Sequence, residues 1–197
     1  LLTLKPGLFT AQGRDHVGQV WFHDLGVHAE ASRASAGLLT GASTLWPARR
    51  HAQHKGSFGD VWVVGGAAGM AGAALLAARA ALVAGAGRVH LVPLDPQSPA
   101  LDPLHPELMH RPLAALHDAR TPLANATVVC GCGGGDAVRE HLPGLIARAG
   151  RLLLDADALN AAAADPSLTR VLELRASRGR ATLLTPHPLE AARLLGL

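Results

Sequence analysis

Short apolar runs alternate with longer Ala- and Leu-rich stretches from residue 59 onward. Runs with almost no polar interruption are typical of strands that are buried on both faces. They predict strands at 60–64, 88–92, 126–130, 151–154 and 181–184. The stretches between them predict helices at 73–83, 136–148 and 188–195. This alternation indicates an α/β fold, with a mostly parallel sheet and helices on both of its faces.

The first part of the chain lacks this alternation. The runs 1–4 and 17–22 have the composition of short strands, but they are too small to bury a core. Residues 28–53 mix Ala, Ser, Gly, Pro and Arg, which is typical of a linker, with room for one short helix. Residues 93–121 interrupt the later pattern and are rich in Pro, His and Leu, so we interpret them as a flap.

Composition narrows the classes of protein to consider. Apolar residues make up 49% of the chain and charged residues 17%, which excludes a disordered chain. The formal net charge is +3 and the Arg residues are scattered, so we expect no nucleic-acid partner. Cys130 and Cys132 are too close for an ordinary disulfide and lack the second pair of a zinc site. No secretory signal opens the chain and the apolar stretch 71–83 is too short to span a bilayer, so we expect a cytoplasmic protein without a membrane partner.

Four predicted strands end in sequences that suit a binding site. These sequences are Gly65–Gly69, Gly131–Gly135, Asp155–Asn160 and Thr185–Pro188. Parallel strands place their carboxyl ends at one edge of the sheet, where ligands bind in open α/β folds. We therefore expect the four sequences to line one crevice.

The first of these sequences joins a strand directly to a helix. Gly65, Gly66 and Gly69 allow a ligand close to the backbone, and the free N–H groups of a helix N-terminus attract an anion. Together with Lys55 they form our candidate anion loop. The spacing matches neither a phosphate loop nor the Rossmann fingerprint, and the glycines could equally serve only a tight turn.

The other three strand ends carry further candidates. Gly131–Gly135 has so little side chain that a ligand or a neighbouring strand end must pack against its backbone. Asp155 and Asp157 can hold a Mg²⁺-bound phosphate, position a hydroxyl or cap a helix, and capping is our interpretation of Asp157. We place Asn160 in the same crevice, and His187, fixed between two prolines, is a candidate ligand contact.

Several motifs together give a resemblance to a known family. They are His54–Gly59, Val63–Ala73, Pro106–Met109, Leu154–Asn160 and Thr185–Pro188, in the family's order. On these motifs the chain from residue 54 to about 196 resembles the NAD(P)H-hydrate dehydratase family. The resemblance implies a ribokinase-like fold.

The resemblance also implies a reaction. The family restores NADH or NADPH that has been hydrated on the nicotinamide ring, by phosphorylating the added hydroxyl of the (S)-hydrate and then eliminating phosphate. The resemblance implies that the hydrated NAD(P)H contacts Ala73, Gly133, Gly135 and His187. It also implies that ADP or ATP is the phosphoryl donor and that Mg²⁺ binds together with this nucleotide.

The N-terminal residues carry a second resemblance. Leu4–Thr10 and the run 17–27 are similar to the end of the NAD(P)H-hydrate epimerase domain, which precedes the dehydratase in many bacterial proteins. We therefore expect residues 1–27 to be the tail of an epimerase-like domain, 28–53 a linker, and 54–197 the N-terminal part of a dehydratase domain.

The same comparison leaves the catalytic residue unassigned. The family's nucleotide-binding segment and its Gly-x-Gly-Asp motif, which carries the catalytic Asp, are expected beyond residue 197. We therefore expect the isolated chain to be inactive. Two local departures are mild: Cys132 and Gly134 stand where the family usually has Pro and Leu, and Leu189 stands where Gly is usual.

Two other functions stay open at this point. A ribokinase-like kinase of a small alcohol or vitamin precursor would use the same fold and phosphoryl chemistry. A non-catalytic piece that only binds ligand or packs into an oligomer is the third interpretation. In each case the expected partners are a small-molecule substrate, a nucleotide and further copies of the chain in a homo-oligomer.

Overall fold

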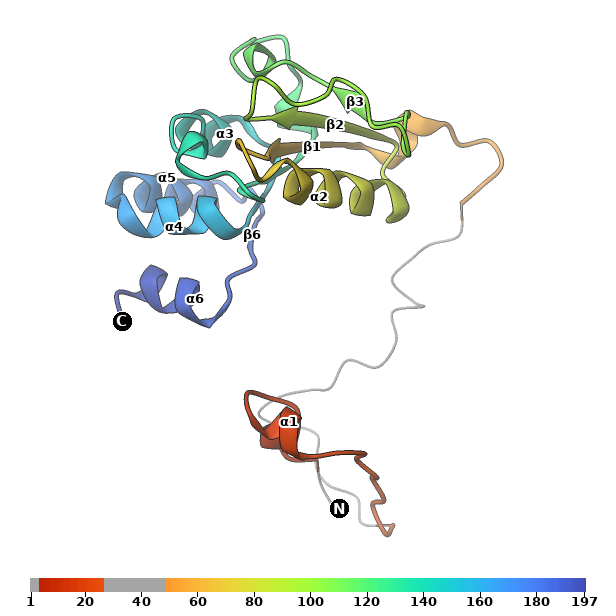
Figure 1. The fold of residues 1–197 in the computed structure, drawn as a ribbon, viewed down its shortest axis with the longest axis vertical. Coiled ribbons are helices and arrows are strands. Elements are labelled where there is room, and N and C mark those ends of the chain that lie inside the picture. The colour runs from red at the N-terminus through yellow and green to blue at the C-terminus, as the bar shows by residue number, and fades with distance from the viewer. Residues whose placement is uncertain (1–3, 27–48) are drawn as a thin grey trace. The chain divides into compact units, whose positions relative to one another are not determined.

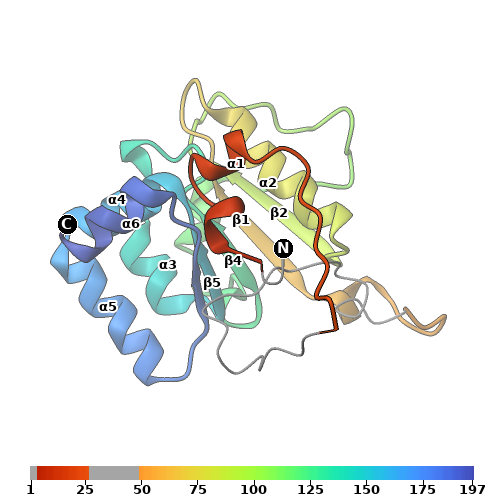
Figure 2. The ribbon, with the colours of Figure 1, turned by 90° about the horizontal axis from the view of Figure 1, so that it is seen from below.

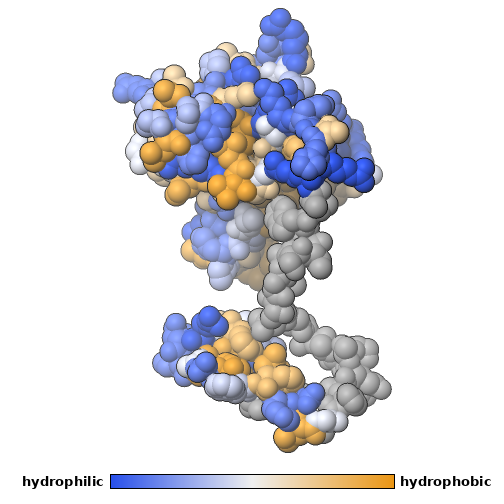
Figure 3. Space-filling view, turned by 90° about the vertical axis from the view of Figure 1, so that its right-hand side faces the viewer, coloured by the Kyte–Doolittle hydropathy of each residue, from blue (hydrophilic) through white to orange (hydrophobic). Residues whose placement is uncertain are grey.

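The computed structural model describes residues 4–26 and 49–197, and the chain divides into two units at residue 50. The smaller unit contains the 3₁₀-helix Pro6–Leu8 and the helix α1 (Gly13–His16). The predicted strand at 17–22 is wrong: no strand forms among the described residues of this unit, so this segment has no ladder partner. Trp21 is 77% exposed, and apolar surface is visible on this unit (Figure 3). The predictions for residues 1–3 and for most of the linker lie outside the described residues.

A six-stranded sheet forms the centre of the larger unit (Figure 1). The strands are β1 (Asp60–Gly65), β2 (Arg88–Pro93), β3 (Met109–His110), β4 (Thr127–Cys130), β5 (Arg151–Leu154) and β6 (Thr182–Leu184). Their spatial order is β3-β2-β1-β4-β5-β6, and all neighbours are parallel. The predicted parallel sheet is confirmed, with the two-residue β3 as an addition.

Alternate residues of β1 point to two separate apolar cores. Val63 packs with Ala74 and Ala78 of α2 (Ala71–Val83) on one face. Trp62 and Val64 belong to the core of the opposite face. That core is built with residues of α3 (Leu142–Arg148), α4 (Ala156–Ala164) and α5 (Pro166–Ser177). The prediction of helices on both faces is therefore confirmed, and Figure 2 shows α2 lying along β1 and β2.

Two helices differ from the prediction. The expected helix 136–148 is divided into the 3₁₀-helix Asp136–Val138 and α3, which begins at Leu142 with Pro143 in its first turn. A proline lacks the N–H of a helix interior and is tolerated only at the start, which explains the division. The helix α5 was not predicted; it starts at Pro166 and is capped by Asp165, whose carboxylate accepts from the Ser167 N–H.

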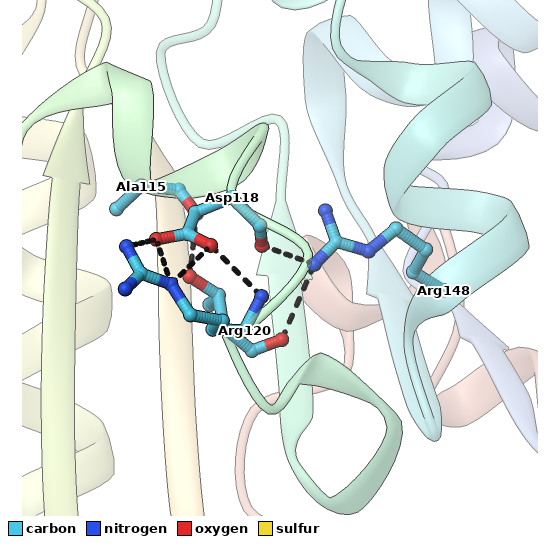
Figure 4. Close-up of polar contacts among 5 residues, drawn as sticks. Ala115, Asp118, Arg120 and Arg148 are labelled. Atoms are coloured by element: carbon cyan, nitrogen blue, oxygen red, sulfur yellow. Dashed lines mark hydrogen bonds and ion pairs between the residues drawn. The ribbon is translucent and has the colours of Figure 1, made fainter.

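Residues 93–121 are better anchored than the predicted flap. They contribute β3 and the 3₁₀-helix Leu113–Leu116. The Arg148 guanidinium donates hydrogen bonds to the carbonyl oxygens of Leu116 (2.6 Å) and Asp118 (2.8 Å). The Asp118 side chain in turn pairs with Arg120 (Figure 4). Because α3 holds this segment through backbone carbonyls, it forms a fixed wall of the domain.

The β6 edge of the sheet is the least covered part of this unit. Leu183 and Leu184 are 57% and 40% exposed, and the final helix α6 (Pro188–Leu195) contacts mainly α4. Complete coverage of both faces therefore does not extend to β6 among the described residues. None of the helices in residues 4–26 and 49–197 is long and apolar enough to cross a membrane.

Arg175 of α5 joins three parts of the fold. Its side chain is buried, with the residue 3% exposed. The guanidinium donates to the carbonyl oxygens of Ile146 (2.6 Å) and Ala149 (2.7 Å) at the end of α3. It also donates to the Thr182 hydroxyl of β6 (3.1 Å).

Replacing this guanidinium should be costly. We expect Arg175→Met to lower the free energy of unfolding by about 2–4 kcal/mol, because buried carbonyls lose their donors. The exposed Arg178 serves as the matched control, and Arg178→Met should change stability by less than about 0.5 kcal/mol. Urea denaturation measures both, and equal losses in the two variants would contradict the assigned role.

Candidate functional site

Two glycine-containing loops meet at the carboxyl ends of β1 and β4. The Gly66 N–H donates to the Cys132 carbonyl (3.0 Å), and the Ala67 N–H donates to the Gly133 carbonyl (2.7 Å). The two strands are neighbours in the sheet, so their end loops leave it side by side. The predicted sequences 65–69 and 131–135 therefore form one continuous backbone surface.

The start of α2 packs against this surface. Gly133 has a φ of 59°, and a Cβ on it would lie 2.9 Å from the Ala73 side chain and 2.8 Å from the Met70 carbonyl oxygen. Only glycine permits so close an approach in this conformation. No side chain caps the N-terminus of α2 at Met70, so its first N–H groups add positive potential next to the loops.

Asp155 and Asp157 connect the third strand end to both neighbours. The Thr185 hydroxyl donates to one oxygen of Asp155 (2.7 Å), and the Cys132 thiol donates to the other (3.4 Å). Asp157 accepts from the Gly135 N–H (2.8 Å). The interpretation of Asp157 as the cap of its own helix is thus wrong: its carboxylate supports the glycine loop instead.

Ala156 directs these two carboxylates to different partners. Its φ is 43°, a left-handed conformation that an L-residue other than glycine adopts at a cost of about 1–2 kcal/mol. Strain of this kind persists only where the surroundings fix it, and here both flanking side chains are hydrogen-bonded. The arrangement leaves neither aspartate as a free base.

His187 lies at the fourth strand end and caps α6. Its Nδ1 accepts from the N–H groups of Leu189 (3.1 Å) and Glu190 (3.4 Å), while the Glu190 carboxylate accepts from the His187 N–H (3.0 Å). This is a capping box, with Nε2 of His187 3.2 Å from the buried Glu190 carboxylate. The structure therefore gives the ring a capping role, and its contact with a ligand stays a prediction.

Two predicted site residues do not join the glycine loops. Lys55 lies in the 3₁₀-helix Lys55–Phe58, before β1, so the full length of that strand separates it from Gly65–Gly69. Asn160 accepts a hydrogen bond from Arg193 (2.6 Å) and ties α4 to α6. Sequence order alone made Lys55 look closer to the glycine turn than it is, and the place of Asn160 in the crevice stays a prediction.

Cys132 is a site residue that the sequence did not reveal. Burial, assisted by the nearby Asp155 carboxylate, raises the pKa of the Cys132 thiol to about 11, so it stays protonated and donates. Thr185 acts on the same carboxylate. Their place at strand ends was the available signal, but the partner of each side chain depends on the turn geometry.

The described residues do not assemble a metal centre. Nowhere in residues 4–26 and 49–197 do three His, Cys, Asp or Glu side chains gather in a way that could hold a metal ion. Asp155 and Asp157 are each engaged by protein donors, so they do not fit a shared Mg²⁺ site. The surface is suited instead to binding through backbone groups and a helix N-terminus.

Comparison with known proteins bears on the occupant of this surface. A family model described as NAD(P)H-hydrate dehydratase matches residues 61–197. The chain is 36% identical to the bifunctional NAD(P)H-hydrate repair enzyme Nnr of Coxiella burnetii, over 98% of this chain and 39% of that protein. It is 43% identical to the ADP-dependent (S)-NAD(P)H-hydrate dehydratase of Neisseria meningitidis, over 77% of this chain and 51% of that protein. The chain thus spans about half or less of these relatives' length.

Solved structures agree with the fold. A ribokinase-like superfamily protein of Enterococcus faecalis matches with a TM-score of 0.58 at 22% identity, covering 76% of this chain and 52% of that one. The ADP/ATP-dependent NAD(P)H-hydrate dehydratase of Bacillus subtilis, co-crystallized with ATP/Mg²⁺, matches with a TM-score of 0.57 at 26% identity, covering 77% and 52%. The predicted ribokinase-like architecture is confirmed.

The contact between the two loops can be tested by adding one methyl group. A Cβ on Gly65 would collide with the Cys132 carbonyl oxygen, whereas a Cβ on Gly72 meets nothing within 4 Å. We expect Gly65→Ala to lower the free energy of unfolding by about 2–3 kcal/mol. Gly72→Ala, inside α2, should leave it unchanged or raise it by up to about 1 kcal/mol. Denaturant titration measures both values, and a neutral Gly65→Ala would show that the loops are not in close contact.

Proposed function

The chain belongs to the NAD(P)H-hydrate dehydratase family, and from this we propose that the protein dehydrates (S)-NAD(P)H-hydrate to NAD(P)H with ADP or ATP. The observation that carries the proposal is the joined surface of the 65–69 and 131–135 loops, which lies inside the matched region. It presents backbone groups at the edge of the sheet where ligands bind in parallel α/β folds.

The geometry suggests a role for each part of the surface. The hydrated nicotinamide nucleotide lies along Ala73, Gly133 and Gly135, where the absence of side chains lets a flat ring approach the backbone. The uncapped start of α2 favours the anionic part of the ligand. Asp155 and Asp157 position the loop through Cys132 and Gly135 and take no direct part in the chemistry.

The proposed reaction has two steps, phosphorylation and elimination. The hydroxyl oxygen of the hydrate attacks the terminal phosphoryl group of ADP or ATP, which gives a phosphate ester, AMP or ADP, and a proton. Loss of that phosphate together with a ring proton restores the reduced nicotinamide. Mg²⁺ would accompany the nucleotide phosphates and screen their charge; Asp155 and Asp157 do not supply its ligands.

Three further expectations stay predictions. They are an epimerase-like domain that includes residues 1–27 and interconverts the R and S hydrates, a homo-oligomeric state, and a cytoplasmic location. The Coxiella relative is named bifunctional and aligns with 98% of this chain, including its N-terminal part, which supports the first of them.

The function is tested directly by activity. The protein at its full natural length, given hydrated NADPH with ADP or ATP, should regain the absorbance of the reduced nicotinamide and release one phosphate per turnover. The same mixture without nucleotide is the control. A stable phosphorylated alcohol, formed without recovery of the absorbance, would favour a kinase and overturn the proposal.

A substitution at His187 separates ligand contact from capping. Asn is among the best N-cap residues, so His187→Asn keeps the cap and loses only the pairing of Nε2 with Glu190, which should lower the free energy of unfolding by less than about 1 kcal/mol. It removes Nε2, and we expect the KM for the hydrate to rise about 10-fold. His187→Ala should show the same KM and in addition lose about 1 kcal/mol of stability. An unchanged KM in both variants would limit His187 to capping.

A further inference from the structure

A cavity of about 190 Å³ lies between α2 and the segment that follows β2. Figure 2 shows this segment running beside α2. The apolar part of its lining includes Ala71, Ala74, Leu75, Leu91, Leu101 and Leu104. A cavity of this size is below the range of about 300–1,000 Å³ that encloses whole drug-sized ligands. It therefore suits one flat ring system and not a complete nucleotide.

An ion pair fixes the outer wall of this cavity. The Arg79 guanidinium of α2 donates two hydrogen bonds to the Asp102 carboxylate, at 2.7 and 2.8 Å. Asp102 is 2% exposed and also accepts from the Leu104 N–H, and the Arg79 hydrogen bonds lower its pKa to about 2. Because the two charges satisfy each other, the wall is rigid and offers no unpaired charge to a ligand.

The polar groups of the cavity lack partners. Ser98 Oγ and both ring nitrogens of His110 are buried and make no hydrogen bond. Both residues also line a second cavity of about 460 Å³, next to the first. A buried polar group that is left unpaired destabilises the fold, so a ligand that pairs these atoms gains binding free energy from them.

These atoms define the chemistry of an occupant. A neutral imidazole offers one donor and one acceptor, and a hydroxyl offers both. The remaining lining is apolar, and the only charges, on Arg79 and Asp102, are paired. We propose that the 190 Å³ cavity, at its Ser98 and His110 side, binds a purine base, whose flat apolar faces and donor–acceptor edge match this lining.

The cavity adjoins the glycine loops, which identifies the source of the purine. Pro93, in its wall, pairs in register with Gly65. The next residues, Leu94 and Asp95, donate to the carbonyl oxygens of Gly65 (2.8 Å) and Gly66 (3.1 Å). When the nicotinamide end of a dinucleotide occupies the loops, its adenine end thus lies in this neighbouring cavity. This assignment rests on the proposed function.

The test uses a substrate that lacks the adenosine half. The protein at its full natural length is given the hydrate of NADH or the hydrate of reduced nicotinamide mononucleotide, each with saturating ADP or ATP. The readout is the ratio of the two kcat/KM values. We expect the wild type to prefer the dinucleotide at least 10-fold, and His110→Phe, which keeps a ring but no hydrogen-bonding nitrogen, to reduce that preference about 10-fold.

Controls separate binding from folding. Ser98→Ala is the milder second variant and should reduce the preference in the same direction. His105→Phe, in the same segment but outside both cavities, should leave the ratio at the wild-type value. A His110→Phe ratio equal to that of the wild type would overturn the proposal, because both substrates would then lose the same factor.

The remaining outcomes distinguish the sources of the base. A wild type without preference for the dinucleotide overturns the substrate assignment. Calorimetry with AMP tests whether the cavity binds a free nucleotide instead. If His110→Phe abolishes AMP binding but leaves the preference ratio unchanged, the cavity holds the purine of a free nucleotide. That result would also overturn the substrate assignment. If neither hydrate is dehydrated with ADP or ATP, the proposed function fails first.

Discussion

The backbone hydrogen bonds between the loops after β1 and β4 are the contact on which the site depends. The Gly66 and Ala67 N–H groups donate to the carbonyls of Cys132 and Gly133, so neither loop can move alone. Glycine is required because the approach at Gly65 leaves no space for a side chain. The loops thereby form a bare backbone surface at the ligand-binding edge of the sheet.

The rest of the domain holds this surface in place from both sides. On one side Asp157 accepts a hydrogen bond from the Gly135 N–H. Asp155 accepts hydrogen bonds from Cys132 and Thr185, which follow two other strands. On the other side, Leu94 and Asp95 donate to the first glycines of the turn. Guanidinium groups do the same for the scaffold: the buried Arg175 joins α3 to β6, and the partly buried Arg148 holds backbone carbonyls of the 113–121 segment. Such fixed geometry lets the surface bind a ligand without a large rearrangement.

The sequence predicted the scaffold well because its signals are local. Apolar runs of strand length indicate strands that are buried on both faces of a parallel sheet. Ala-rich stretches indicate the helices that cover it, and glycines after strands indicate tight turns. Pro143 is an equally local signal, and it argues against a single helix over 136–148. The two-residue β3 carries no periodic signal at all.

The side-chain partners at the site could not be predicted in the same way. The role of Asp157 depends on the left-handed turn at Ala156, and that of Cys132 on which strand lies next to β4. Lys55 precedes the glycine turn closely in sequence, yet β1 carries the chain away from it. The central claim is that the joined loops hold the hydrated nicotinamide. It is tested most directly by a crystal structure of the full-length protein with NADPH hydrate. The account predicts ring density in van der Waals contact, within about 4 Å, with the backbone of Gly133 and Gly135. Ring density elsewhere, with these loops bare, would contradict it.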